Sequence, residues 1–144
     1  MLSGLSQDQA EEVMALANIE QRGIGERLTT AGDKNSDLFL VLSGKLDAVT
    51  EDGDKIAELG GGSPIGEVSF LDGEARTTHT ICLTPVVAAR FPAAELRKLM
   101  VKDKVVGFIL MANLSRILTR RLRNANIRLD ELLDHTGDVW KHAL

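Results

Sequence analysis

The chain has 144 residues, of which 44% are hydrophobic and 26% are charged, a composition that fits one soluble globular domain. The formal net charge of −4 argues against general binding to nucleic acid or anionic membranes, so we expect a partner recognised at a defined site. The single cysteine, Cys82, excludes an intramolecular disulfide and a thiolate cluster for zinc, and we expect it in the core. The sequence shows neither a signal peptide nor the roughly 20 apolar residues that span a bilayer, so a cytoplasmic protein outside the membrane is expected.

The N-terminal half changes from a helical to a strand-like pattern. Residues 6–18 carry acidic side chains first and then apolar ones at helical spacing, which predicts a short amphipathic helix. Residues 27–91 consist of short apolar or alternating runs between turn signals, which is typical of an antiparallel all-β unit. Within it, the apolar run 38–42 predicts a buried strand, and residues 52–53, Asp-Gly, predict a hairpin turn. Further strands are predicted at residues 77–83 and 86–91, and a short helix at residues 93–100.

Residues 104–134 are expected to form one long helix without proline, about 45 Å in length, which exceeds what a small β unit can cover. Its apolar side chains alternate at spacings of four and three, as in a coiled coil. We expect the near half to pack on the β unit and the far half to form a homodimer; alternatively, the whole stripe packs within one chain. The seam comprises Met111, Ser115, Leu118, Leu122, Ala125, Leu129 and Leu132, and another face of the first turns carries Val105, Phe108, Ile109 and Ala112.

The stretch 60–78 combines flexible glycines, a helix-compatible turn, one acid and one arginine. A helical turn that begins near Glu67 presents unpaired N–H groups to an anion such as phosphate. Arg76, ten residues after Gly66, can make a forked contact with two phosphate oxygens. Ionised Glu67 only accepts hydrogen bonds, so it suits a ribose hydroxyl. This is a nucleotide pattern, although an ordinary loop with a surface ion pair uses the same residue types.

Over about residues 3–125 the chain resembles the cyclic nucleotide-binding domain family of catabolite activator proteins, cyclic-nucleotide-dependent kinases and cyclic-nucleotide-gated channels. The resemblance implies a mainly β fold with flanking α: a double-stranded β-helix, or jelly-roll-like β-roll, with a short N-terminal and a long C-terminal helix. It also implies a β-roll part at residues 1–103 and a lid and dimerisation part at residues 104–144. The resemblance rests on Ala31-Gly32-Asp33, Leu38 to Gly44, Ile65-Gly66-Glu67, Arg76-Thr77-Thr78, Phe91-Pro92 and Leu96 to Met100.

The resemblance also implies a role for each site residue. Glu67 is expected to bind the ribose 2′-hydroxyl, and Arg76 to hold the cyclic phosphate with the amides of Val68 and Ser69. Ser69 replaces the alanine or glycine common in the family, which is tolerated because the backbone does the binding. The helix near Arg121 is expected to cover the base. The complete expected ligand-binding set is Gly66, Glu67, Val68, Ser69, Arg76, Thr77, Thr78, Arg121 and Asn124.

The choice between cAMP and cGMP stays open. Thr77 matches the threonine of cGMP-selective kinase sites, but bacterial members carry a hydroxyl there while binding cAMP. The chain has no tyrosine, and its one tryptophan, Trp140, lies outside the matched region, so an aromatic base cap is missing. Arg120, Arg121, Asn124 or an apolar residue, from this subunit or another, would then cap the base.

We therefore expect a non-enzymatic sensor without a cofactor, whose long helix hinges near residues 102–104 and signals to a protein partner or attached effector. A degenerate dimerisation module of the same fold is the main alternative.

A metal-dependent β-helix enzyme would need clustered ligands, whereas His79, His135 and His142 are scattered along the sequence. His79 is expected at the pocket mouth. No direct DNA binding is expected, because residues 135–144 are too few for a helix-turn-helix domain. The helix arginines, Arg116, Arg120, Arg121, Arg123 and Arg128, are expected to form a solvated face that pairs with Asp130, Glu131 and Asp134.

Overall fold

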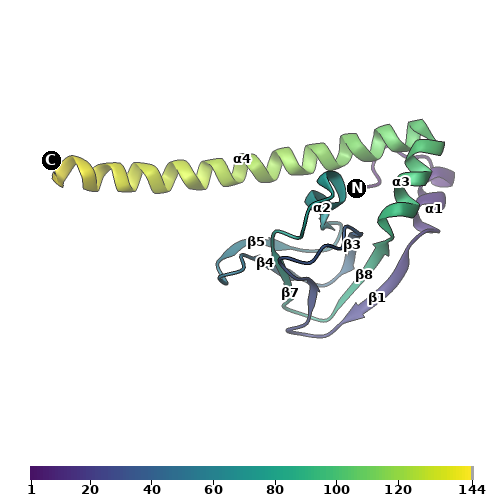
Figure 1. Ribbon diagram of the computed structural model, residues 1–144, viewed down its shortest axis with the longest axis horizontal. Coiled ribbons are helices and arrows are strands. Elements are labelled where there is room, and N and C mark those ends of the chain that lie inside the picture. The colour runs from purple at the N-terminus through teal and green to yellow at the C-terminus, as the bar shows by residue number, and fades with distance from the viewer. Residues whose placement is uncertain (144) are drawn as a thin grey trace.

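The computed structural model describes the backbone of residues 1–143 and the side chains of residues 1–134, so the side chains of Trp140, His135 and His142 lie outside the described part. Two four-stranded antiparallel sheets, ordered β1-β8-β3-β6 and β2-β7-β4-β5, form the predicted β-roll beside a long C-terminal helix (Figure 1). The strands are β1 Asn18–Arg22, β2 Arg27–Thr29, β3 Leu38–Ser43, β4 Leu46–Val49, β5 Lys55–Leu59, β6 Pro64–Ile65, β7 His79–Cys82 and β8 Val86–Phe91. The helices are α1 Gln7–Met14, α2 Glu67–Asp72, α3 Ala93–Lys102 and α4 Lys104–Ala143.

The N-terminal helix is shorter than the sequence pattern predicted. Ser6 caps α1 and forms a reciprocal capping box with Gln9, which fixes the start of the helix. The helix ends at Met14, and from Asn18 onward the chain forms β1, an edge strand paired with β8. The expectation of a helix through residue 18 was therefore wrong. No side chain of β1 is fully buried, so this strand lacks the apolar alternation by which a strand is recognised.

Other elements follow the prediction more closely. The run 38–42 lies in β3, and the Asp52-Gly53 turn joins β4 to β5 with Gly53 at a φ of 94°. The predicted strand 77–83 shortens to β7, because residues 77 and 78 still belong to the loop that leads into the strand. Cys82 is 1% exposed in the core between the two sheets, as expected.

The helix α4 has two distinct faces in its first turns. Val106, Leu110 and Leu114 are at most 1% exposed and pack in a core that also includes α1, α3 and Phe70 of α2. Val105 and Phe108, in contrast, are 59% and 75% exposed. The near half of α4 therefore packs on the roll, as expected, but the face that carries Val105 and Phe108 is not the face that is buried. The buried face contains every third or fourth residue, as a helix seated on a core requires.

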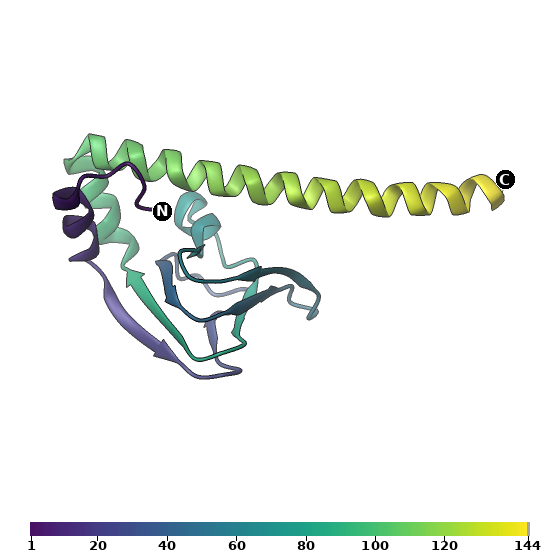
Figure 2. The ribbon, with the colours of Figure 1, turned by 180° about the vertical axis from the view of Figure 1, so that it is seen from behind.

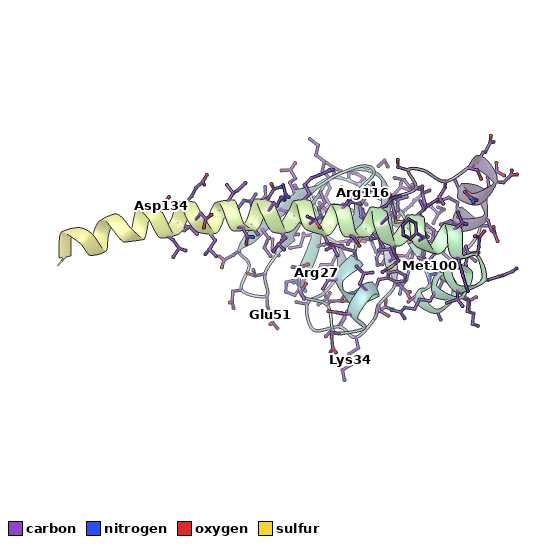
Figure 3. The ribbon with its side chains drawn as sticks, turned by 90° about the horizontal axis from the view of Figure 1, so that it is seen from above. Arg27, Lys34, Glu51, Met100, Arg116 and Asp134 are labelled. Carbon is purple, nitrogen blue, oxygen red and sulfur yellow. The ribbon has the colours of Figure 1, made fainter. Side chains whose placement is uncertain are left out.

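The far half of α4 extends past the roll (Figures 1 and 2). It continues to Ala143, nine residues beyond the predicted end. Seen from above, Arg116 lies over the roll, whereas Asp134 lies past the hairpin tip marked by Glu51 (Figure 3). In its third turn, α4 is bonded to the N-terminal segment through Asn113, whose side-chain amide donates to the carbonyl oxygens of Met1 and Ser3 at 2.7 Å each.

Candidate functional site

A cavity of about 340 Å³ lies between α2, the sheet that contains β4 and β5, and the middle of α4. Every residue of the expected ligand-binding set lines it: Gly66, Glu67, Val68, Ser69, Arg76, Thr77, Thr78, Arg121 and Asn124. These residues come from three segments of the chain that only the fold brings together. Arg120, considered as a base cap, is exposed and does not line the cavity.

The helical turn α2 provides backbone donors at one end of the cavity. Gly66 caps the turn with a φ of 81°, a left-handed conformation that favours glycine. The first bond of the turn runs from Phe70 N–H to Gly66 O at 3.1 Å, so the amides of residues 67–69 precede the first turn of bonds. Unpaired amides and the positive end of the turn favour an anionic group at this end of the cavity.

Arg76 lies against Gly66 and is 6% exposed. Its Nη1 donates to Gly66 O at 3.0 Å, and its Nη2 donates to Asp37 O at 2.6 Å and to Asn35 Oδ1 at 3.2 Å. These bonds use three of the five guanidinium donors and leave two for a ligand. Burial lowers the pKa of Arg76, but a guanidinium stays charged near neutral pH. The sequence reasoning missed Asn35 and Asp37; the only local signal was a short run of turn-forming residues, 35–37.

Glu67 and Arg121 join the roll to α4 across the cavity. The Glu67 residue is 7% exposed, and its Oε1 forms an ion pair with Arg121 Nη1. Arg121 Nη2 also donates to Pro64 O at 3.0 Å. Further along α4, Arg128 Nη1 donates to the carbonyl oxygen of Ile56. The expected solvated face was therefore wrong for Arg121, which contacts the roll through Glu67 and Pro64, whereas Arg128 is exposed as expected but bonds the roll at Ile56.

The remaining walls of the cavity are mainly apolar. Ile56, Ala57 and Leu59 contribute from β5, while Leu118, Leu122 and Ala125 contribute from α4. Thr29 and Thr80 add a pair of hydroxyl groups 2.9 Å apart. Thr80 Oγ1 accepts from the Thr29 amide, and Thr29 Oγ1 donates to Thr78 O, so these hydroxyls chiefly hold β2 to β7. The cavity thus offers an anion-binding end, an acid and an apolar region.

The histidine within residues 1–134 has a structural hydrogen bond. His79 Nδ1 accepts a hydrogen bond from the Ala31 amide at 2.9 Å, and His79 does not line the cavity, contrary to its expected place at the mouth. Across the described side chains, no three His, Cys, Asp or Glu residues are grouped as metal ligands would be. Among the described helices, none has the length and apolar character that crossing a membrane requires.

A β-roll whose cavity combines an amide-lined turn, a buried arginine and an acid has the chemistry of a binding site for an anionic ligand. Residues 23–103 match the family model for the cyclic nucleotide-binding domain. The chain belongs to the cyclic nucleotide-binding domain family, whose members are typically regulatory rather than catalytic.

Solved structures agree with this family. The chain is similar to the Thermus thermophilus catabolite activator protein, with a TM-score of 0.76, 27% identity, and coverage of 91% of this chain and 62% of that one. It is also similar to the N-terminal domain of a transcriptional regulator from Streptomyces coelicolor, with a TM-score of 0.68, 28% identity, and coverage of 87% and 89%. A cyclic nucleotide-binding domain from Methylobacillus flagellatus, at 24% identity and a TM-score of 0.82, shares the fold over 89% of this chain and 74% of that one.

Curated relatives include much longer proteins. Glutaminase 2 of Bradyrhizobium diazoefficiens is 30% identical over 135 residues, which are 92% of this chain and 21% of that protein. Glutaminase 1 of the same organism is 28% identical over 132 residues, again 21% of its length. The chain therefore spans about a fifth of the length of these two relatives.

Proposed function

We propose that this protein binds cAMP or cGMP in the cavity and that it acts as a regulatory sensor. The observation that carries the proposal is Arg76, a buried guanidinium with two unused donors beside the free amides of α2. A buried charge is costly unless it is paired, and a cyclic phosphate would supply the opposite charge. A degenerate dimerisation module would have no need to keep this charge at a cavity.

Each end of the cavity suits one part of the ligand. The amides of Val68 and Ser69 would hold the cyclic phosphate together with Arg76. Glu67 is buried and acceptor-only when ionised, so it would accept a bond from the ribose 2′-hydroxyl. The apolar side chains of β5 and α4 would enclose the base, with Asn124 at its edge.

We further propose that α4 transmits binding, so that residues 1–103 act as the sensor and residues 104–144 as the output. Arg121 contacts Glu67, and Glu67 is the group expected to bind the ribose. A ligand that competes for this carboxylate, or that reinforces its pair with Arg121, would change the relative stability of two α4 positions. An attached effector or a protein partner would detect that difference; the glutaminase relatives suggest an enzyme in the same chain as one form of effector.

The ligand proposal predicts that purified protein binds a cyclic nucleotide in preference to its linear counterpart. Isothermal titration with cAMP, cGMP and 5′-AMP measures this directly. The linear phosphate is bulkier and carries more charge than a cyclic phosphodiester, so a turn built for the latter should bind it more weakly. Absence of binding to both cyclic nucleotides would favour the degenerate module instead.

The homodimer proposal rests on the exposed far half of α4. Leu129 is 53% exposed and lies on the predicted seam, whereas Ile127 is 56% exposed and lies two residues away on nearly the opposite face. We expect Leu129→Asp to convert a dimer into a monomer in sedimentation experiments, because it places a charge in an apolar seam. Ile127→Asp is the matched control and should leave the dimer intact. A wild-type monomer with and without nucleotide would contradict the proposal.

A further inference from the structure

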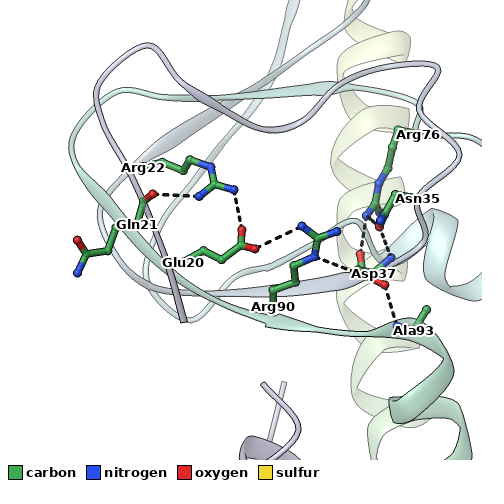
Figure 4. Close-up of polar contacts among 8 residues, drawn as sticks. All are labelled: Glu20, Gln21, Arg22, Asn35, Asp37, Arg76, Arg90 and Ala93. Carbon is green, nitrogen blue, oxygen red and sulfur yellow. Dashed lines mark hydrogen bonds and ion pairs between the residues drawn. The ribbon is translucent and has the colours of Figure 1, made fainter. Parts of the chain in front are cut away.

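The loop between β2 and β3 is bonded to the backbone of Arg76. The Gly32 amide donates to Arg76 O at 2.8 Å, and the Arg76 amide donates to Asp33 O at 2.7 Å. These two bonds are separate from the bonds that Asn35 and Asp37 accept from the guanidinium of Arg76 (Figure 4). The loop therefore helps to fix where the Arg76 backbone lies, and with it the guanidinium at the edge of the cavity.

His79, the first residue of β7, holds the same loop at a neighbouring point. Its Nδ1 accepts a hydrogen bond from the Ala31 amide at 2.9 Å, one residue before Gly32. Only an unprotonated ring nitrogen can accept a hydrogen bond, so this bond requires the neutral ring. A protonated imidazole carries hydrogen on both nitrogens and would set an N–H group against the Ala31 N–H group. Protonation of His79 therefore breaks a bond to the loop that holds Arg76.

Ala31 occupies the second position of a tight turn. The Asp33 amide donates to Thr30 O at 3.1 Å, and Gly32, the third residue of the turn, has a φ of 90°. This arrangement fits a type II turn, whose own hydrogen bond does not use the amide of the second residue. The His79 ring satisfies that amide. Without an acceptor the half-buried amide of Ala31 would be unpaired, which would destabilise this conformation of the turn.

The elements beside His79 carry charged groups, but among residues 1–134 none of these groups forms an ion pair with the ring. Val49 of β4 pairs with His79 in the sheet, and Lys55 of β5 lies opposite Val49. The Lys55 ammonium is itself held by ion pairs with Asp47 and Glu58 at 3.3 Å each. The bond to Ala31 is therefore the contact that a change in ring charge affects most directly. The charged groups on these elements are Arg27, Asp33, Asp47, Glu51, Lys55 and Glu58.

We propose that His79 is a positioning residue for the nucleotide site and that it makes nucleotide affinity depend on pH. This inference rests on the proposed function. With a neutral ring, the turn at residues 30–33 keeps all its bonds and holds the Arg76 backbone in place for the phosphate. With a protonated ring, the turn loses a bond, so the ligand has to order a looser site and binds more weakly. Nucleotide binding therefore favours the neutral ring and releases protons.

The test compares nucleotide affinity at about pH 7.5 and about pH 5.5, between which an imidazole ordinarily changes its charge. By titration calorimetry with cAMP and cGMP, we expect the wild type to bind roughly two- to tenfold more weakly at the lower pH. In His79→Asn, the asparagine Oδ1 can replace Nδ1 as the acceptor, and it does not titrate. This variant should keep the affinity at the higher pH and lose the part of the acid effect that His79 causes. The other ionisable groups are the same in both proteins, so the difference between them isolates His79.

Ala31→Pro removes the same bond from the donor side. Proline is favoured at the second position of a type II turn, and the turn does not use the amide that the substitution deletes. We expect Ala31→Pro to show the same weak pH dependence as His79→Asn, so it keeps the test decisive if His79→Asn does not fold. A second measurement is the number of protons released on binding at about pH 6, obtained by calorimetry in two buffers of different ionisation enthalpy. The wild type should release more protons than either variant.

The possible results lead to different conclusions. A residue that only stabilised the fold would change the melting temperature with pH but not the affinity of the folded protein. An affinity ratio between the two pH values that is equal in the wild type and in His79→Asn, or in Ala31→Pro if His79→Asn does not fold, overturns the positioning role while the proposed function stands. A wild-type protein that binds neither cyclic nucleotide at either pH overturns the proposed function, and this inference with it.

Discussion

Replacing Arg76 by alanine is expected to weaken cyclic nucleotide binding by roughly ten- to hundredfold. The substitution removes a charge-assisted contact from a largely buried position, a loss of about 1.5 to 3 kcal/mol. It also removes the hydrogen bonds to Gly66 O and Asp37 O, so a lower melting temperature should accompany the loss. Titration calorimetry and thermal unfolding of the same preparation measure the two effects separately.

Two control variants define the cause of that loss. Arg76→Lys keeps a positive charge but loses the forked geometry, so it should recover only part of the affinity. Ser69→Ala alters a buried side chain of the same cavity and keeps the backbone amide, so its affinity should stay close to that of the wild type. An unchanged dissociation constant in folded Arg76→Ala would remove the arginine from its proposed role.

Gly66→Ala is expected to reduce both stability and ligand affinity strongly. A Cβ atom at Gly66 would lie 2.2 Å from Arg76 Nη1, closer than such atoms approach, and 3.0 Å from Asp37 O, which is a tight contact. The arginine cannot move away freely, because three hydrogen bonds hold it. The added methyl group must therefore displace the guanidinium that is proposed to bind phosphate.

Gly73 offers a matched control at the other end of α2. It also has a positive φ, 72°, but a Cβ atom there would meet nothing within 4 Å. Gly73→Ala should therefore cost only the backbone strain of roughly 1 to 2 kcal/mol and leave affinity almost unchanged. Equal affinities for the two variants would show that the contact between Gly66 and Arg76 has no part in binding.

The sequence predicted the residues that line the cavity better than the residues that support them. The turn at Glu67 and the arginine at position 76 were recognisable as candidates because of their local glycine, acid and arginine pattern and because of the resemblance to a known family. The supporting residues Asn35 and Asp37 were not, because their partner Arg76 is about 40 residues away and only the fold brings them together. The same reason hid the pair between Glu67 and Arg121, which are 54 residues apart.

The edges of the fold were also hard to predict. β1 carries polar side chains on an edge strand, so no periodic apolar signal distinguished it from the end of α1. On α4, the residues that the core buries, Val106, Leu110 and Leu114, belong to neither of the two apolar faces named from the sequence. Periodicity identifies a helix reliably, but it does not say which apolar stripe of a helix that is apolar on several sides meets the core.

The projecting length of α4 gives the protein a mechanical property. Its 40 residues extend about 60 Å from the elbow at Asp103, and only the first part rests on the roll. A tilt of about 10° at the elbow would sweep the distal tip through about 10 Å, whereas the part of α4 that lines the cavity, from Leu118 to Arg128, would travel about 4 to 7 Å. Under the proposed transmission, α4 would act as a lever arm, and a partner at its tip would sense a larger movement than the one that occurs at the binding site.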